Sequence, residues 1–449
     1  MSAPDPARLP PQVPYIIGNE ACERFSFYGM RNILVQFLVS SVILAYLPAE
    51  MREGAAKDVF HSFVIGVYFF PLLGGWLADR FFGKYDTVLW FSLIYCAGHA
   101  CLAMFDDNKN GFYTGLFLIA LGSGGIKPLV VSFVGDQFTR DNKALAKVVF
   151  DAFYWVINFG SFFASLLMPL FLRSYGPAVA FGIPGVLMGI ATFVFWLGRR
   201  KYVRVPPTRG QHPDAAVDSV RAVLRILIVF ALVTPFWSLF DQKASTWVLQ
   251  GKTMTIPHEA WWWPSFLVKE AGQMQALNPL LVMLIIPFNN AFLYPALRRA
   301  GFEPSALRRM GAGIVFSALA WVVAGMIQLR IDSGAVTSLS LQVWPYLLLT
   351  FGEVLVSATA LEFAYSQATQ SMKGVIMAFW YLTSTFGSLW VLITNAAVRN
   401  EAVTSRIAST GLSENAFLMF FFAAFAMATA LAFAAYARTY PMQDNYRAA

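Results

Sequence analysis

Residues 414–437 read ENAFLMFFFAAFAMATALAFAAYA, and the part from Phe420 to Phe433 contains no charged side chain. Strands are usually about five or six residues long, whereas a helix needs about 20 apolar residues to cross the hydrocarbon of a bilayer. Similar runs at 116–121 and 162–172 belong to stretches that reach or approach that length. Of all residues, 57% are hydrophobic and 13% are charged, against about a quarter charged in soluble proteins. We therefore predict an all-α protein that crosses a membrane many times.

Twelve such stretches can be marked between loops that are charged or rich in Pro and Gly. We place them near residues 15–47, 58–79, 85–105, 111–135, 146–173, 177–198, 220–249, 272–297, 310–330, 341–368, 374–398 and 414–437. A basic, proline-containing linker at 201–218 separates an N-terminal bundle of six helices at 1–200 from a C-terminal bundle of six at 219–449. Paired halves of this kind are typical of secondary transporters.

The basic residues predict the orientation of these helices. If both termini are cytoplasmic, 20 of the 33 Lys and Arg residues lie in inner loops and tails, and nine lie outside. The concentration of basic residues in the inner loops and tails therefore accounts for the net charge of +8. We expect no nucleic-acid partner. Residues 1–14 are polar and lack the pattern of a removable signal peptide. We expect a multi-pass protein of a cell membrane, such as the bacterial inner membrane.

The sequence offers no motif for catalysis, metal binding or nucleotide binding. The three cysteines lie in or beside apolar segments, which disfavours a disulfide framework, and Cys and His show no metal-ligand spacing. The run from Gly122 to Lys127 resembles a phosphate-binding loop only superficially, because Pro128 stands where Ser or Thr is needed. We expect no cofactor and no enzyme activity.

Charges inside the predicted helices are the strongest sign of function, because each costs several kcal/mol if it is left unpaired in hydrocarbon. Apart from charges near helix ends, they fall in the first, fourth, seventh and tenth helices: Glu20, Glu23, Arg24, Arg31, Lys127, Asp241, Lys243, Glu353 and Glu362. We expect these four helices to line one polar cavity. Structural pairing between helices is the alternative, but it does not explain the use of every third helix.

Spacing adds geometry, because residues four apart on a helix share a face. Glu20, Arg24, Tyr28 and Arg31 form one stripe, and the same spacing joins Tyr154 to Asn158, Trp237 to Asp241 and Glu362 to Ser366. Glu353 lies nine residues before Glu362, about half a turn out of phase, so we assign it a structural role. For Lys243 we expect a side chain that extends to the outer surface.

A series of motifs resembles the proton-dependent oligopeptide transporter (POT/PTR) family, within the major facilitator superfamily. In chain order they are EACERFSFYG at 20–29, GGWLADRFFGK at 74–84, GSGGIKP at 122–128, FYWVINFGS at 153–161, FWSLFDQ at 236–242 and LEFAYSQ at 361–367. The resemblance covers most of the chain. It implies a major facilitator fold and a symporter that imports di- and tripeptides with protons by alternating access.

The resemblance also implies roles for individual residues. Arg31 and Lys127 would bind the peptide carboxylate, and Glu362 would bind its amino terminus. The remaining substrate contacts would come from Asn158, Asn278, Tyr28, Tyr68, Tyr154, Trp237 and Ser366. A zwitterionic peptide needs a cationic and an anionic site at a fixed separation, and a low dielectric strengthens both contacts.

Proton coupling needs groups that bind a proton in one state and release it in another. Glu20 and Glu23 beside Arg24 form such a cluster, because protonation of a carboxylate frees a cation for the substrate. His61 is a further candidate, since imidazole titrates near neutral pH and animal members of the family carry a histidine here. We hypothesise that a His61–Asp241 bridge closes the outer face.

Two alternatives remain open. The first is a transporter of the same family that carries another small anion or a peptide-like metabolite, against which Glu362 argues. The second is an intramembrane enzyme that uses His61 as a base, which would need a nucleophile or acceptor site around that residue. The expected partners are a di- or tripeptide, protons and the lipid bilayer, and we expect the monomer to function alone.

Overall fold

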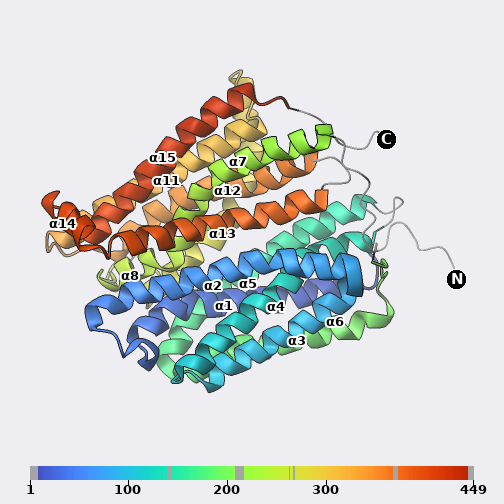
Figure 1. Cartoon of the computed structure of the whole chain (residues 1–449), viewed down its shortest axis with the longest axis horizontal. Coiled ribbons are helices and arrows are strands. Elements are labelled where there is room, and N and C mark those ends of the chain that lie inside the picture. The colour runs from blue at the N-terminus through green and yellow to red at the C-terminus, as the bar shows by residue number, and fades with distance from the viewer. Residues whose placement is uncertain are drawn as a thin grey trace. The chain divides into compact units, whose positions relative to one another are not determined.

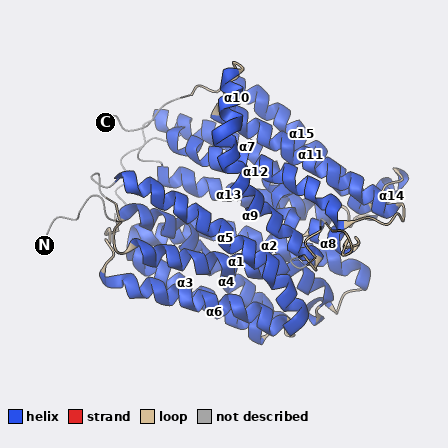
Figure 2. Cartoon of the chain, turned by 180° about the vertical axis from the view of Figure 1, so that it is seen from behind, coloured by secondary structure: helices blue, strands red, loops and turns tan. Residues whose placement is uncertain are grey.

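The computed structural model describes residues 9–138, 143–207, 217–261, 263–265, 268–367 and 373–442. All named elements in these residues are helices joined by loops (Figures 1 and 2). Contacts divide the chain into two compact units. Unit 1 comprises Met1–Arg52 and Gly66–Gln211, and unit 2 comprises Glu53–Ile65 and His212–Ala449. The predicted boundaries at 1–200, 201–218 and 219–449 stay a prediction.

The helices of unit 1 follow the predicted spans closely. They are α1 (Val13–Ser40), η1 (Val42–Leu44), α2 (Ala49–Leu77), η2 (Ala78–Phe82), α3 (Gly83–Met104), α4 (Lys109–Asp136), α5 (Lys143–Tyr175), α6 (Pro177–Leu197) and η4 (Gly198–Arg200). The first part of α2, Glu53–Ile65, has its contacts in unit 2. Local sequence sets several helix starts: the Asn108 side chain accepts a hydrogen bond from the Gly111 amide to begin α4, and Pro177 begins α6.

Unit 2 has the same long helices with more interruptions. They are α7 (Val217–Asp241), η5 (Gln242–Ala244), α8 (Thr246–Lys252), η6 (Ala271–Ala276), α9 (Leu277–Phe288), η7 (Asn289–Leu293), α10 (Tyr294–Arg299), α11 (Ala306–Asp332), η8 (Leu339–Gln342), α12 (Val343–Gln367), α13 (Lys373–Ala397), α14 (Glu401–Ser409) and α15 (Glu414–Thr439). The stretch expected as one helix at 220–249 is broken after Asp241. Interrupted helices are frequent at the binding sites of transporters.

Nine helical segments among the described residues are long and apolar enough to cross a membrane, with α2, η2 and α3 counted as one. With 28 residues α1 is long enough as well, but it carries Glu20, Glu23, Arg24 and Arg31. A helical protein with many membrane-spanning segments is therefore confirmed. The count of twelve crossings and the cytoplasmic position of both termini stay predictions.

Small residues bring helices together inside each unit. In unit 1, α3 packs against α4 and α6, and α1 packs against α5 and α6. A Cβ atom at Gly98 of α3 would lie 2.8 Å from the Gly115 carbonyl oxygen of α4, so this crossing requires glycine. In unit 2, Gly387 of α13 similarly allows close approach to Trp237 of α7. The core there includes Trp247 and Trp321, whose ring centres lie 5.7 Å apart.

Candidate functional site

The most concentrated charge in unit 1 lies on a single turn of α1. The Arg24 guanidinium forms ion pairs of 2.7 Å with Glu20 and 2.6 Å with Glu23. These side chains are buried, with exposed fractions of 8% for Arg24, 2% for Glu20 and 0% for Glu23. The structure therefore brings together three residues that the sequence predicted as a coupling cluster.

The charges in this cluster do not balance. Within the cluster one guanidinium faces two carboxylates, and Lys127 of α4 is close enough to act electrostatically on Glu20. The second oxygen of Glu20 and the first oxygen of Glu23 have no hydrogen-bond partner among the described residues. An excess negative charge in a buried site is costly unless another cation or a proton neutralises it. The geometry can therefore hold a proton.

Lys127 on α4 is another buried cation of unit 1, with an exposed fraction of 6%. Its ammonium lies 3.5 Å from the centre of the Phe27 ring and 4.7 Å from the centre of the Tyr68 ring. Aromatic faces attract a desolvated ammonium, so these rings stabilise the charge. Sequence spacing predicted Lys127, and the family resemblance implied Tyr68. The contact with Phe27 was not foreseen, although Phe27 stands beside Tyr28 in the first motif.

The other predicted residues of unit 1 lie on α1 and α5. Arg31 is buried, with 3% of its side chain exposed, and Tyr28 is half-buried. Asn158 is 8% exposed and donates a hydrogen bond of 3.0 Å to the backbone carbonyl of Tyr154, one turn earlier on α5. Tyr154 is 43% exposed. The predicted common face of Tyr154 and Asn158 is therefore present, with an exposed phenol beside a buried amide.

Two buried titratable groups of unit 2, Asp241 and His61, have hydroxyl partners. Asp241, which is 1% exposed, accepts a hydrogen bond of 2.9 Å from Ser384 of α13. His61 is fully buried; its Nε2 lies 3.2 Å from the hydroxyl of Ser245 and its Nδ1 lies 3.4 Å from that of Ser388. A hydroxyl can donate or accept, so it can satisfy neutral or charged imidazole. The hypothesised His61–Asp241 bridge stays a prediction.

Ser384 and Ser388 belong to a polar stripe on α13 that was not predicted from the sequence. Ser384, Ser388 and Asn395 are separated by four and seven residues, so they share one face of α13, and Arg399 lies two residues beyond the end of that helix at Ala397. Asp58 of α2 accepts a hydrogen bond of 3.1 Å from Asn395 and forms an ion pair with Arg399. The helical spacing of Ser384, Ser388 and Asn395 was a signal in the sequence, but the partners of these residues on α2 and α7 were not apparent from it.

Two more predicted residues of unit 2 have close neighbours. Asn278 donates a hydrogen bond of 2.5 Å to Glu353 and one of 3.0 Å to Thr350, so the glutamate assigned a structural role contacts a predicted substrate ligand. The ring centre of Trp237 lies 5.8 Å from that of Trp380. Its indole nitrogen is buried and has no hydrogen-bond partner in the described part of the chain.

The expectation for Lys243 is wrong. Its side chain is only 5% exposed, and its ammonium lies 3.0 Å from the centre of the Phe240 ring. All three residues of η5 are buried, so the break after Asp241 directs this segment into the interior of unit 2. Glu362 and Ser366 belong to α12, but their side chains lie outside the described residues.

Comparisons with known proteins identify the family. The POT family model matches residues 85–218 and 208–409. The chain belongs to the POT family. It is 32% identical to Peptide transporter 3 of Caenorhabditis elegans over 375 residues, which cover 72% of this chain and 51% of that protein. The human solute carrier family 15 member 2 is 32% identical over 379 residues, which cover 73% of this chain and 50% of the human protein. The chain spans about half the length of the curated relatives it matches.

Solved structures of POT family members share the fold. A crystal structure described as an auto-inhibited POT family peptide transporter has 59% sequence identity and a TM-score of 0.92, covering 98% of this chain and 99% of its own. The POT family transporter PepTSo has 55% identity and a TM-score of 0.91, with coverage of 98% and 100%. The chain is thus similar to multi-pass membrane transporters along nearly its whole length.

Proposed function

We propose that this POT family chain is a proton-coupled symporter that imports di- and tripeptides by alternating access. Twelve helices would cross the membrane, with both termini in the cytoplasm. The names of similar proteins support a peptide substrate, since they include a peptide transporter of Caenorhabditis elegans and a crystallised POT family peptide transporter. The proton gradient would supply the energy without a resident cofactor, and one chain would suffice.

The observation that carries the proposal is the unbalanced cluster on α1. Two buried carboxylates share one guanidinium, at 2.7 and 2.6 Å. A proton on Glu20 or Glu23 would neutralise the excess charge and loosen the hold on Arg24. Binding of the proton and release of the cation would then be linked, which is what coupling to an anionic substrate group requires.

The remaining roles follow the pattern of the family. Arg31 and Lys127 would bind the peptide carboxylate, and Glu362 would bind the amino terminus. Asn158 and Asn278 would bind the peptide backbone. The side-chain pockets would be formed by Tyr28, Tyr68, Tyr154, Trp237 and Ser366. The buried state of Arg31 and Lys127 supports this assignment, because a desolvated cation binds a carboxylate more strongly than an exposed one.

Uptake of a labelled dipeptide into proteoliposomes tests the proposal. We expect accumulation against a gradient when an inward pH gradient is imposed, and only equilibration without it. Glu20→Gln and Glu23→Gln should retain counterflow exchange but lose gradient-driven accumulation. Glu303→Gln is a matched control, because Glu303 is exposed and pairs with Arg298.

Three outcomes would contradict parts of this proposal. If no dipeptide exchanges in counterflow while another small anion does, the substrate class is wrong. If accumulation does not depend on the pH gradient, the coupling ion is wrong. Loss of counterflow and accumulation together in both glutamate variants would argue against a separate coupling role for this cluster.

A further inference from the structure

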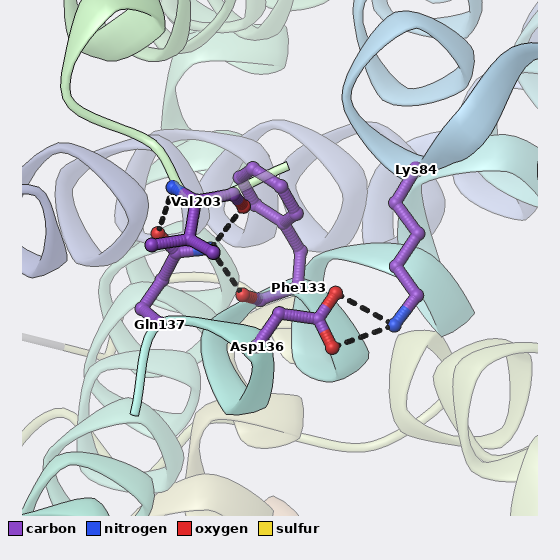
Figure 3. A network of polar contacts seen from close by, with 5 residues as sticks. All are labelled: Lys84, Phe133, Asp136, Gln137 and Val203. Carbon is purple, nitrogen blue, oxygen red and sulfur yellow. Dashed lines mark hydrogen bonds and ion pairs between the residues drawn. The ribbon is translucent and has the colours of Figure 1, made fainter. Parts of the chain in front are cut away.

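The segment after α6 is held firmly to unit 1, although it has no regular secondary structure. We call residues 201–207 the linker strap. The Gln137 side chain, at the end of α4, accepts a hydrogen bond of 2.9 Å from the Val203 amide and donates one of 3.1 Å to the Val203 carbonyl (Figure 3). It also donates to the Phe133 carbonyl at 2.9 Å. One buried amide thus clamps both backbone groups of Val203.

Aromatic packing fixes the residue before the clamp. The Tyr202 ring centre lies 5.1 Å from that of Phe133 and 5.2 Å from that of Phe195, and its hydroxyl donates a hydrogen bond of 2.9 Å to the Phe195 carbonyl. Burial raises the pKa of the Tyr202 phenol above its usual value, so this hydroxyl stays a donor at physiological pH. The strap is therefore preorganised at the end of a membrane-spanning segment, Pro177–Arg200.

The strap positions basic side chains around a cavity. A cavity of about 250 Å³ lies between residues 204–207 and the first residues of α3. Lys84 and Arg204 line it, as does Asp86. Liquid water occupies about 30 Å³ per molecule, so the space admits a phosphate and part of the group attached to it.

Both cations have hydrogen-bonding capacity beyond their contacts with the protein. The Arg204 guanidinium stacks 3.8 Å from the centre of the Tyr85 ring and donates one hydrogen bond to the Arg199 carbonyl. Lys84 donates to the two carboxylate oxygens of Asp136 at 2.9 and 2.7 Å (Figure 3). Guanidinium has five N–H donors and ammonium has three, so each cation can donate to a further acceptor.

The surroundings combine positive charge with exposed apolar surface. Three further cations precede Arg204 in the sequence: Arg199, Arg200 and Lys201. Phe82 and Val205, which line the cavity, are 55% and 48% exposed. Basic residues next to the end of a membrane helix attract anionic lipids, and apolar side chains beside them suit the acyl boundary.

We propose that the linker strap and the start of α3 form a binding site for the phosphate headgroup of an anionic phospholipid, between Arg204 and Lys84. Asp86 and the Lys84–Asp136 pair limit the positive charge of the cavity, so Arg204 is the main electrostatic contact. Gln137 is a positioning residue, since it holds the strap without touching the cavity. The site is separate from the residues proposed for transport.

Lipid titration followed by native mass spectrometry tests this site on the purified full chain, with phosphatidylglycerol as the probe. We expect tighter binding of phosphatidylglycerol than of phosphatidylcholine. Arg204→Gln should weaken phosphatidylglycerol binding roughly fivefold, the factor that corresponds to about 1 kcal/mol for one basic residue near a charged membrane. Arg199→Gln removes the same charge from a residue that stacks on Trp196 outside the cavity, and it should have less effect.

Gln137→Met tests the preorganisation, because it removes the clamp without changing any charge. It should weaken phosphatidylglycerol binding as Arg204→Gln does. Equal losses in the Arg199 and Arg204 variants would show diffuse attraction and overturn the site. Equal binding of the two lipids would overturn it as well. Displacement of phosphatidylglycerol by an equal concentration of glycerol phosphate would show that the ligand is a free phosphate.

Discussion

The α1 cluster of unit 1 and the pair of groups Asp241 and His61 in unit 2 stabilise buried titratable side chains in different ways. In unit 1, Glu20 and Glu23 are paired with a permanent charge, Arg24. In unit 2, Asp241 and His61 are paired with the hydroxyls of Ser384, Ser245 and Ser388. Charged groups therefore contact each other in the α1 cluster, while hydroxyl dipoles contact Asp241 and His61.

This difference determines how each region responds to a change in protonation. An ion-paired cluster in a low dielectric is strongly coupled, because a proton on one carboxylate alters the energy of the guanidinium and of the other carboxylate. A serine hydroxyl can rotate from donor to acceptor, so its partner can change charge with little rearrangement. The α1 cluster is therefore suited to link proton and substrate, and the α13 hydroxyls to tolerate a titrating neighbour.

The largest effect is expected from Arg24→Gln. This variant leaves two buried carboxylates without their cation, and loss of one partner from a buried ion pair typically costs about 3–5 kcal/mol. A proton on either carboxylate would reduce the excess charge, so the loss of stability should be smaller at acidic than at alkaline pH. Thermal unfolding in detergent at several pH values measures this.

Arg298→Gln is the control for that prediction. Arg298 is 59% exposed and pairs with Glu303, and exposed pairs contribute about 0–1 kcal/mol. A melting temperature of Arg24→Gln that matches that of the control at every pH would contradict the importance of the buried pairing.

Ser384→Ala should have the next largest effect. It removes the hydroxyl that donates to Asp241, and hydrogen bonds to charged groups contribute about 1.5–3 kcal/mol. Thr383→Val is the matched control, because the Thr383 hydroxyl donates to the Trp380 carbonyl of its own helix. The comparison of the two melting temperatures measures the effect. Equal decreases in melting temperature would mean that the hydrogen bond to Asp241 contributes no more to stability than a bond within the helix.

His61→Gln should change the pH dependence of the uptake rate more than the maximal uptake rate. Glutamine can bond to Ser245 and Ser388 but cannot titrate, so the part of the pH profile near neutral pH that depends on imidazole should flatten. Initial rates of gradient-driven uptake measured across this range test the prediction. His99→Gln, at a buried histidine that contacts Ser26, should retain the original profile. Unchanged uptake by His61→Gln at every pH would remove this residue from the coupling mechanism.

Ser388→Ala should have the smallest effect. Its hydroxyl lies 3.4 Å from the His61 ring, a long hydrogen bond, and a typical neutral bond contributes about 0.5–1.5 kcal/mol. Combination with His61→Gln in a double-mutant cycle isolates the pairwise energy. A coupling larger than that of Ser384 with Asp241 would reverse the proposed order of importance within unit 2.

Much of the fold could be predicted, because membrane-spanning helices satisfy their own backbone hydrogen bonds and differ from loops in composition. The predicted span at 177–198 corresponds to α6 (Pro177–Leu197), and that at 414–437 corresponds to α15 (Glu414–Thr439). The predicted span at 220–249 did not reveal the break after Asp241, because the polar run from Asp241 to Thr246 is short and apolar residues continue on both sides of it. Lys243 lies in this break and is buried, contrary to the expectation of a side chain at the outer surface.

The sequence by itself determined the helices, the family and the Glu20–Arg24–Glu23 cluster, because contacts within one or two helical turns depend on spacing alone. The tertiary structure decided what lies opposite each polar group across helices. It paired Asp241 with Ser384, placed Lys127 against Phe27, and clamped Val203 with Gln137. Val203 and Gln137 are 66 residues apart in the sequence, and Asp241 and Ser384 are 143 apart. Only the packing of helices determines which of such distant side chains meet.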